Sequence, residues 1–502
     1  MSLARLLDLS CLAVAVLFSA GCSVVVNAHS QKEELMTGYL AGQREQALQE
    51  LEYKLREPAW YNSSVVNTGD EIMWRLEAGA LDCIMAHDDE CIAHFERAEA
   101  LIEEFDDRAI VSLRDIGAES AVLVTNLNAL PYRGWCRDRI MIPVYKSFAY
   151  LGKGDEDGFK VELNRLRVNQ DKVLADYRKF FDEEEAALQK QERENKEAAS
   201  SVEPDKIMRN PRNRELNKTL RGTELVAHRG FADFFNPFAI FLSAYGYARA
   251  DDYQNAIVDF ERLYKAMPNN SSVRRYYVTC LRRIDREVPE HLSGIKDFDF
   301  DIGENHVLVI FANGRSGALK QSSLYIPIVL PGYATVVGVA WPVCEFYKAP
   351  FGALRVKAGG RNFRTFKIAD MDGILAAEYN RRLPMMIVRI CLSTAVKEVG
   401  SYVATRAASE VHEIAGVLTA IGTATYKVLV NTADTRGWEI LPKEFQMVQF
   451  AMPSERSITV SPDGSRQIPI ELPPEAGSAI VMVNAPGNDP AALSFRVFSL
   501  KN

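Results

Sequence analysis

The apolar residues of this 502-residue chain change their spacing near residue 300. Before that point they recur at three- and four-residue steps, as they do across residues 31–57, and this spacing buries one face of a helix. After it, short runs rich in β-branched and aromatic residues, such as 306–312 and 324–330, are separated by Gly and Pro, as is typical of strands. The sequence therefore predicts a helical part followed by a β-rich part.

The predicted fold class is α+β with several domains. A length of 502 residues fits two or three domains, and 47% hydrophobic and 25% charged residues are ordinary for a globular protein. We expect an α-helical domain over residues 31–290 and a β-rich domain over 291–502. Strand runs on both sides of a helical insertion at 371–431 favour a β-sandwich-like second domain. Within the insertion, a new helix is expected to begin at Pro384.

Helical hairpins with the spacing of tetratricopeptide repeats are predicted in the first part. The best match lies at 237–268, a second at 70–106, and a degenerate third copy at 143–170. In such a repeat a small residue lets two helices approach closely, and an aromatic residue fills the space between repeats. The 237–268 copy keeps this spacing in Ala244, Tyr247, Ala256, Phe260 and Pro268.

A charged stretch, assigned to residues 182–224 as a helix or linker, separates the repeats. It has almost no apolar stripe, so it is either a solvated, protruding helix or partly disordered. A partner-binding arm is a less favoured interpretation.

The N-terminus predicts export and lipidation. Arg5, an apolar run over residues 11–21 and Cys22 have the order of a bacterial lipoprotein signal, in which the cysteine is lipidated and becomes the new N-terminus. We therefore expect a signal peptide at 1–21 and a tether at 22–30. A membrane span is disfavoured because it needs about 20 apolar residues; an ordinary signal peptide is the other alternative. Ser23 favours the outer membrane, so the expected location is the cell envelope, with the chain facing the periplasm.

The net charge of −8 and the even spread of Lys and Arg argue against a nucleic-acid partner. In an oxidising periplasm Cys83 and Cys91 are the best candidates for a disulfide, and two buried thiols are the alternative. With His87 and His94 they could also bind zinc, but one helical hairpin would place the cysteines in its core. We therefore predict no metal and no cofactor.

None of the common catalytic motifs for zinc proteases, serine hydrolases or penicillin-binding enzymes is present in the sequence. No catalytic residue is nominated, and a non-enzymatic role is favoured. A hydrolase would need a cleft near Asp434, Arg436 or His412.

Two runs combine polar and aromatic residues with Pro and Gly, at 128–135 and 434–442. Such runs form either a recognition surface, because Arg, Tyr and Trp dominate binding hot spots, or a structural corner. Asp434 is expected to hold Arg436 by a charge-assisted hydrogen bond. The candidate residues are Tyr132, Arg133, Trp135, Asp434, Arg436 and Trp438.

These runs also carry a family resemblance. The segments Leu-Pro-Tyr-x-Gly and Asp-x-Arg-x-Trp-x-x-Leu-Pro, with the 70–170 region and Asn236-Pro237-Phe238, resemble a family of uncharacterised bacterial lipoproteins with a tetratricopeptide-like N-terminal half and a β-rich C-terminal domain. The resemblance implies no established reaction. Some relatives are encoded near lipoprotein activators of peptidoglycan synthases, which implies a role at the cell wall.

The function expected from the sequence is that of a protein-binding scaffold. It would be anchored to the membrane by lipid on Cys22 and would bind protein partners in cell-envelope or peptidoglycan assembly. An envelope hydrolase or a carbohydrate-binding lipoprotein, acting through the C-terminal domain, is the alternative.

Overall fold

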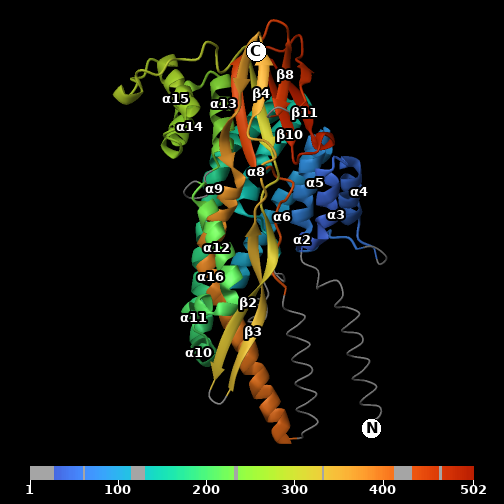
Figure 1. Cartoon of the computed structure of the whole chain (residues 1–502), viewed down its shortest axis with the longest axis vertical. Helices are drawn as coiled ribbons and strands as arrows, with labels where there is room; N and C mark the ends of the chain where they lie inside the picture. Colours follow the sequence, from blue (N-terminus) through green and yellow to red (C-terminus); the bar gives the residue numbers. More distant parts are fainter. Residues whose placement is uncertain are drawn as a thin grey trace.

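The computed structural model describes residues 28–59, 63–114, 131–230, 236–330, 333–411, 432–462 and 466–501. Cys22 and the predicted signal peptide lie outside the described residues. The fold is mixed α and β, as predicted, with the sheets in the C-terminal part. The molecule is elongated, with the β2–β3 hairpin and the helix α16 extending together toward one end (Figure 1).

The N-terminal part is a series of helices that pack in chain order. Three consecutive pairs pack as hairpins, α5 with α6, α8 with α9, and α13 with α14, and each pair also packs on the next helix along the chain. The helices are α2 (Ala28–Gln31), α3 (Glu33–Leu40), α4 (Arg44–Leu55), α5 (Glu71–Met85), α6 (Asp88–Arg114), α8 (Cys136–Gly152), α9 (Glu156–Glu194), α10 (Lys196–Ser200), α11 (Pro204–Arg209), η3 (Pro211–Asn213), α12 (Arg214–Ala227), α13 (Pro237–Arg249), α14 (Tyr253–Ala266), α15 (Ser271–Arg283) and η5 (Glu290–Leu292).

Side-chain caps explain where several of these helices begin. The Asp155 carboxylate accepts a hydrogen bond from the Gly158 amide at the start of α9, and Asn236 and Asp252 cap α13 and α14 in the same way. The chain therefore turns at short polar connections, and the apolar faces of neighbouring helices meet.

Three sheets form the C-terminal part. The largest has the order β11-β10-β1-β7-β6, in which β1 pairs parallel with β10 and antiparallel with β7. A four-stranded sheet has the order β5-β4-β8-β9, and β2 pairs with β3 as a long hairpin. The strands are β1 (His306–Asn313), β2 (Ala318–Leu330), β3 (Tyr333–Glu345), β4 (Leu354–Ala358), β5 (Arg361–Arg364), β6 (Phe366–Asp370), β7 (Glu444–Ala451), β8 (Ser457–Pro462), β9 (Ile468–Glu471), β10 (Ser478–Ala485) and β11 (Ser494–Leu500), with the short helix η6 (Pro490–Ala492) before β11.

The five-stranded sheet is buried on both faces. On one face Val307, Val309 and Phe311 of β1 pack against the four-stranded sheet. On the other, Leu308 and Ile310 join an apolar cluster that continues into the helices. The layers are therefore helices, sheet and second sheet, and one apolar core crosses the predicted boundary at residues 290 and 291.

Helix α16 (Met371–Val411) covers the first part of the insertion expected at 371–431, and residues 412–431 lie outside the described residues. The prediction that a new helix begins at Pro384 is wrong, because α16 continues through this proline. Several neighbouring elements support it, since α9, α10, α12 and β3 all pack against it, and its last turns project beyond them (Figure 1). In the charged stretch, residues 182–194 are the last turns of α9, where Glu184 pairs with Arg389 of α16.

Across the described ranges, no helix combines the length and the apolar character that crossing a bilayer requires.

Candidate functional site

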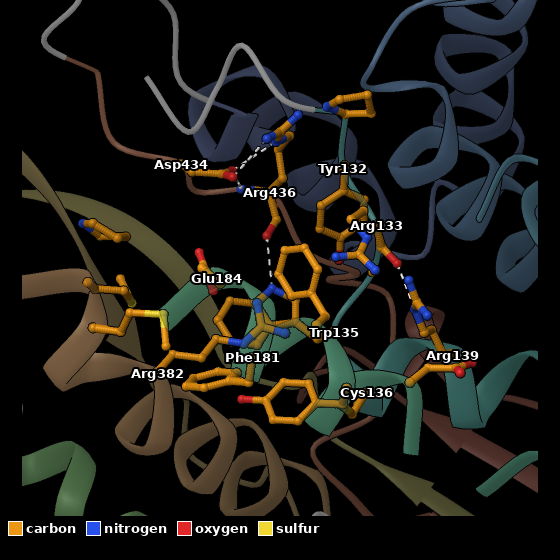
Figure 2. A pocket seen from close by; sticks show the side chains of 18 of the residues that line it. Tyr132, Arg133, Trp135, Cys136, Arg139, Phe181, Glu184, Arg382, Asp434 and Arg436 are labelled. Atoms are coloured by element: carbon orange, nitrogen blue, oxygen red, sulfur yellow. Dashed lines mark hydrogen bonds and ion pairs between the residues drawn. The ribbon is translucent and has the colours of Figure 1, made fainter. Parts of the chain in front are cut away.

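The two polar-aromatic runs meet at one pocket, although about 300 residues separate them in the chain (Figure 2). The pocket has a volume of about 170 Å³, and the loop before α8, helices α9 and α16, and the segment before β7 all contribute to its wall. Five of the six candidate residues predicted from the sequence line it: Tyr132, Arg133, Trp135, Asp434 and Arg436. The sixth, Trp438, lies elsewhere.

The loop before α8 is held by one carboxylate. Asp138, fully buried on the first turn of α8, accepts hydrogen bonds from the Tyr132 hydroxyl and from the Trp135 backbone amide. Burial, and then the charge of Asp138, raise the pKa of Tyr132 well above its usual value, so this hydroxyl stays a donor. The loop thus presents its aromatic rings in a fixed position.

Arg436 fixes the other run. Its Nε donates to one carboxylate oxygen of Asp434 and one terminal nitrogen donates to the other oxygen, both at 2.8 Å, as the sequence predicts. The other terminal nitrogen donates to Asp70 at 3.1 Å. The indole nitrogen of Trp135 donates to the Arg436 carbonyl at 3.2 Å, which joins the two runs directly. Arg436 is only 5% exposed, and its carboxylate partners raise its pKa despite the opposing effect of burial.

Stacked arginines form the wall between the runs. The Arg382 guanidinium lies 4.4 Å from the Trp135 ring and 5.1 Å from the Tyr177 ring, and that of Arg133 lies 3.7 Å from Phe180. Cations on aromatic faces are attracted by the negative charge of the ring face. These contacts hold both guanidinium groups beside aromatic rings of the pocket wall.

Acidic residues behind the wall pair with these arginines. Glu378 is fully buried, accepts from Arg382 at 2.5 Å and from the Cys136 amide at 2.9 Å, and has its pKa raised chiefly by burial. Asp106 accepts from both Arg133 and Arg139 at 2.7 Å. Of the described residues that line the pocket, five are Arg and three are Asp or Glu.

Sequence reasoning missed the helical half of this pocket. Tyr177, Phe180 and Phe181 recur at three- and four-residue steps inside the long polar helix α9, and this spacing was the available signal. Arg382 and Arg389 are two turns apart on α16. The sequence around them did not indicate a site, because the residues that they contact come from α9 and from the loop before α8.

Trp438 belongs to a segment that we term the strap, residues 432–443, which precedes β7 without helix or strand. Trp438 is fully buried, with ring centroids 5.5 Å from Phe95 on α6 and 5.3 Å from Tyr145 on α8. Arg137 donates to its carbonyl at 2.9 Å. The helices therefore hold the strap, and this candidate residue is an anchor in the core.

Cys83 and Cys91 are buried where helix α5 packs against helix α6. Both cysteines are free thiols, and burial, with a hydrogen bond to Cys83, raises the pKa of Cys91. His87 and His94 turn instead to Asp82, at 3.2 and 3.6 Å. In the part of the chain that the structure describes, no group of His, Cys, Asp or Glu is arranged to hold a metal ion. His412, named for a possible hydrolase, lies outside the described residues.

Comparison with known proteins gives no relative: no protein-family model, no curated protein and no solved structure matches the chain.

Proposed function

We propose that this chain is a lipid-anchored protein of the bacterial cell envelope that acts as a scaffold for a protein partner, in envelope or peptidoglycan assembly. Tetratricopeptide-like repeats would build its helical part and lipid on Cys22 would hold it at the outer membrane. The observation that carries the binding role is the pocket in which both polar-aromatic runs meet, because arginine and aromatic side chains dominate binding hot spots.

Close packing inside the helical hairpins supports the repeat assignment. A Cβ on Gly79 of α5 would lie 2.8 Å from the Phe95 ring on α6, so only glycine fits against this aromatic residue. In the α13–α14 hairpin, Ala244 and Ala256 are fully buried and Phe260 is 1% exposed. Small residues opposite a buried aromatic residue are what the repeat spacing predicts.

The strap changes where a partner would bind. Repeat proteins commonly bind ligands on the inner surface of their helices. Here helices α5, α6 and α8 contact the chain's own strap through Glu77, Phe95, Arg137 and Tyr145. The partner would instead bind where the strap begins, at the pocket beside Asp434 and Arg436.

Partner binding is tested by crosslinking and affinity purification of the full-length tagged protein from envelopes in mild detergent. Phe180 lines the pocket, whereas its neighbour Lys179 is exposed and supplies a matched control. We expect wild type and Lys179→Ala to recover the same partner and Phe180→Ala to recover severalfold less. Equal recovery by all three proteins would contradict the proposed role of the pocket.

The anchor is tested separately. A palmitate analogue should label the wild-type protein, and Cys22→Ser should abolish both labelling and membrane retention, because several acyl chains anchor a protein far more stably than one. Cys11, inside the predicted signal peptide, gives the control, and Cys11→Ser should label normally. Membrane retention of Cys22→Ser at the wild-type level would exclude a lipid anchor at this residue.

A further inference from the structure

Two arginine nitrogens in the pocket lack the acceptors that buried donors normally have. Among the residues that the structure describes, Nε of Arg382 and Nε of Arg389 are buried and have no hydrogen-bond partner. Each of these arginines already pairs through a terminal nitrogen with one acid, Glu378 or Glu184. Buried donors are almost always paired, so a group that accepts hydrogen bonds is expected in the pocket.

The two arginines lie on one face of α16. They are seven residues apart, which is two helical turns and a separation of about 10 Å along the axis. Both line the same pocket. The in-plane nitrogens of a guanidinium match the two oxygens of a carboxylate, and the contacts of Arg382 with two aromatic rings restrict its movement.

The remainder of the pocket accommodates an apolar group. Trp135, Tyr177, Phe180 and Phe181 line it together with Met385 and Met386 of α16. Its volume of about 170 Å³ is close to the order of 150 Å³ that suffices for a benzene ring. One amino-acid side chain of moderate size would therefore fill it.

The charge balance favours a singly charged group. Arg382 and Arg389 each have an acidic partner, and Asp176 also lines the pocket. A dianion such as phosphate would face four nearby carboxylates, because Asp434 also lines the pocket, whereas a carboxylate brings one charge to two donors. A carboxylate that carries one apolar side chain of moderate size is what the C-terminal residue of a peptide offers.

We infer that this pocket binds the C-terminal residue of a polypeptide, with its free carboxylate on Arg382 and Arg389 and its apolar side chain among the aromatic rings. The inference rests on the proposed function, because it names what part of the protein partner the pocket recognises.

The test is a calorimetric titration of purified full-length protein in mild detergent. The probes are acetyl-Ala-Ala-Leu with a free carboxylate, the same peptide with a C-terminal amide, and inorganic phosphate. We expect the free acid to bind about tenfold or more tightly than the amide, because hydrogen bonds to a charged group are the stronger ones. Equal affinity for acid and amide, or tighter binding of phosphate, would overturn the inference.

Variants assign the binding to the arginines. Arg382→Gln and Arg389→Gln should each weaken binding of the acid about tenfold and leave the amide almost unchanged. Arg381 is exposed on the same helix, and Arg381→Gln should bind like wild type. If only Arg381→Gln bound the acid and the amide equally tightly, the carboxylate would bind at Arg381 and not at Arg382 and Arg389. If an Arg382 variant fails to fold, the wild-type comparison of acid with amide still decides.

The titration uses no envelope partner, so it separates the two proposals. Binding of the acid with no partner recovered from envelopes would leave the pocket assignment in place and contradict the scaffold. A recovered partner with no binding of the acid would overturn the pocket assignment alone.

Discussion

A buried ion pair joins the first helices to the strap. The Lys32 and Glu77 side chains are fully buried and lie 2.6 Å apart, and Lys32 also donates to the Gly437 carbonyl. The Glu77 carboxylate accepts from the backbone amides of Glu439 and Ile440 at 2.8 and 2.9 Å. One carboxylate therefore satisfies three buried donors from two distant parts of the chain.

Removing this carboxylate should loosen the strap. We expect Glu77→Ala to lower the free energy of unfolding by about 3–5 kcal/mol, because it removes the nearer acid from the buried Lys32, with only Glu439 at 3.8 Å left, and leaves two buried backbone amides without an acceptor. Urea denaturation measures the loss. The double replacement Lys32→Met with Glu77→Leu is the matched control and should recover the part of the loss that comes from the unpaired Lys32 charge, while the Glu439 and Ile440 amides stay without their acceptor. A Glu77→Ala protein as stable as wild type would show that the pair does not hold the strap.

His306 on β1 should make stability depend on pH. It is fully buried, its Nε2 lies 2.9 Å from the Tyr245 hydroxyl, and burial lowers its pKa to about 4. An unfolded histidine has a pKa near 6.5, so between these values only the unfolded state takes up the proton. Stability should therefore be full above about pH 6.5 and fall as the pH drops toward 4, by up to roughly 3 kcal/mol.

Urea titrations at several pH values test this. His306→Gln should reduce the slope of stability against pH across this window but not remove it, because burial also lowers the pKa of His94 to about 4. His291→Gln, at an exposed hydrogen bond to Tyr264, is the control and should keep the wild-type slope. An unchanged slope in His306→Gln would assign the effect to other groups.

At the scale of elements, α16 offers two glycines in contrasting surroundings. A Cβ on Gly373 would lie 2.5 Å from the backbone nitrogen of Gly230, whereas a Cβ on Gly400 would meet no described atom within 4 Å. We expect Gly373→Ala to destabilise the protein by about 1–3 kcal/mol through overpacking. Gly400→Ala should stabilise it by about 0.5–1 kcal/mol, because alanine favours a helix interior.

Thermal unfolding of the two variants beside wild type tests this pair. A destabilised Gly400→Ala would mean that its exposed helix face has a neighbour, and a neutral Gly373→Ala would mean that α16 can move away from Gly230.

The strands were the easiest elements to predict. The expected run at 306–312 is β1, and the expected run at 324–330 is the second half of β2. Runs of β-branched residues between Gly and Pro are local signals. The order of the strands is not local, since β1 pairs with β10, and sequence spacing does not show it.

The pocket, too, could be predicted from the sequence only in part. Tyr132, Trp135 and Arg436 were found from composition, because Trp, Tyr and Arg beside Pro and Gly stand out in a sequence. Arg382 was not found, because its role depends on Trp135 and Tyr177, which lie far away in the chain.

At the scale of the whole molecule, the helical and β-rich parts share one core. Leu308 and Ile480 in the sheet belong to the same apolar cluster as Phe238 and Phe241 in α13. The Phe238 ring stacks on Phe445 of β7 with centroids 4.0 Å apart. The sequence predicted two domains from the change in spacing, but spacing does not show which faces meet.

We therefore expect the two parts to unfold together. Differential scanning calorimetry should give one transition, and the calorimetric and van't Hoff enthalpies should agree. Phe445→Ala should shift this transition as a whole to lower temperature, while Phe495→Ala, at an exposed side chain, should leave it nearly unchanged. Two transitions that respond separately would show that each part is stable alone.

The strap also sets an order of assembly. Helices α3 to α8 are synthesised first, yet the residues that complete their core, Trp438 above all, follow about 300 residues after α8 begins. A chain emerging from its N-terminus would thus lack, for most of its synthesis, the strap side chains that complete this core. The late arrival of the strap makes complete translation a condition for the early helices to close, so a ribosome that stalls before residue 432 would release a chain for proteolysis.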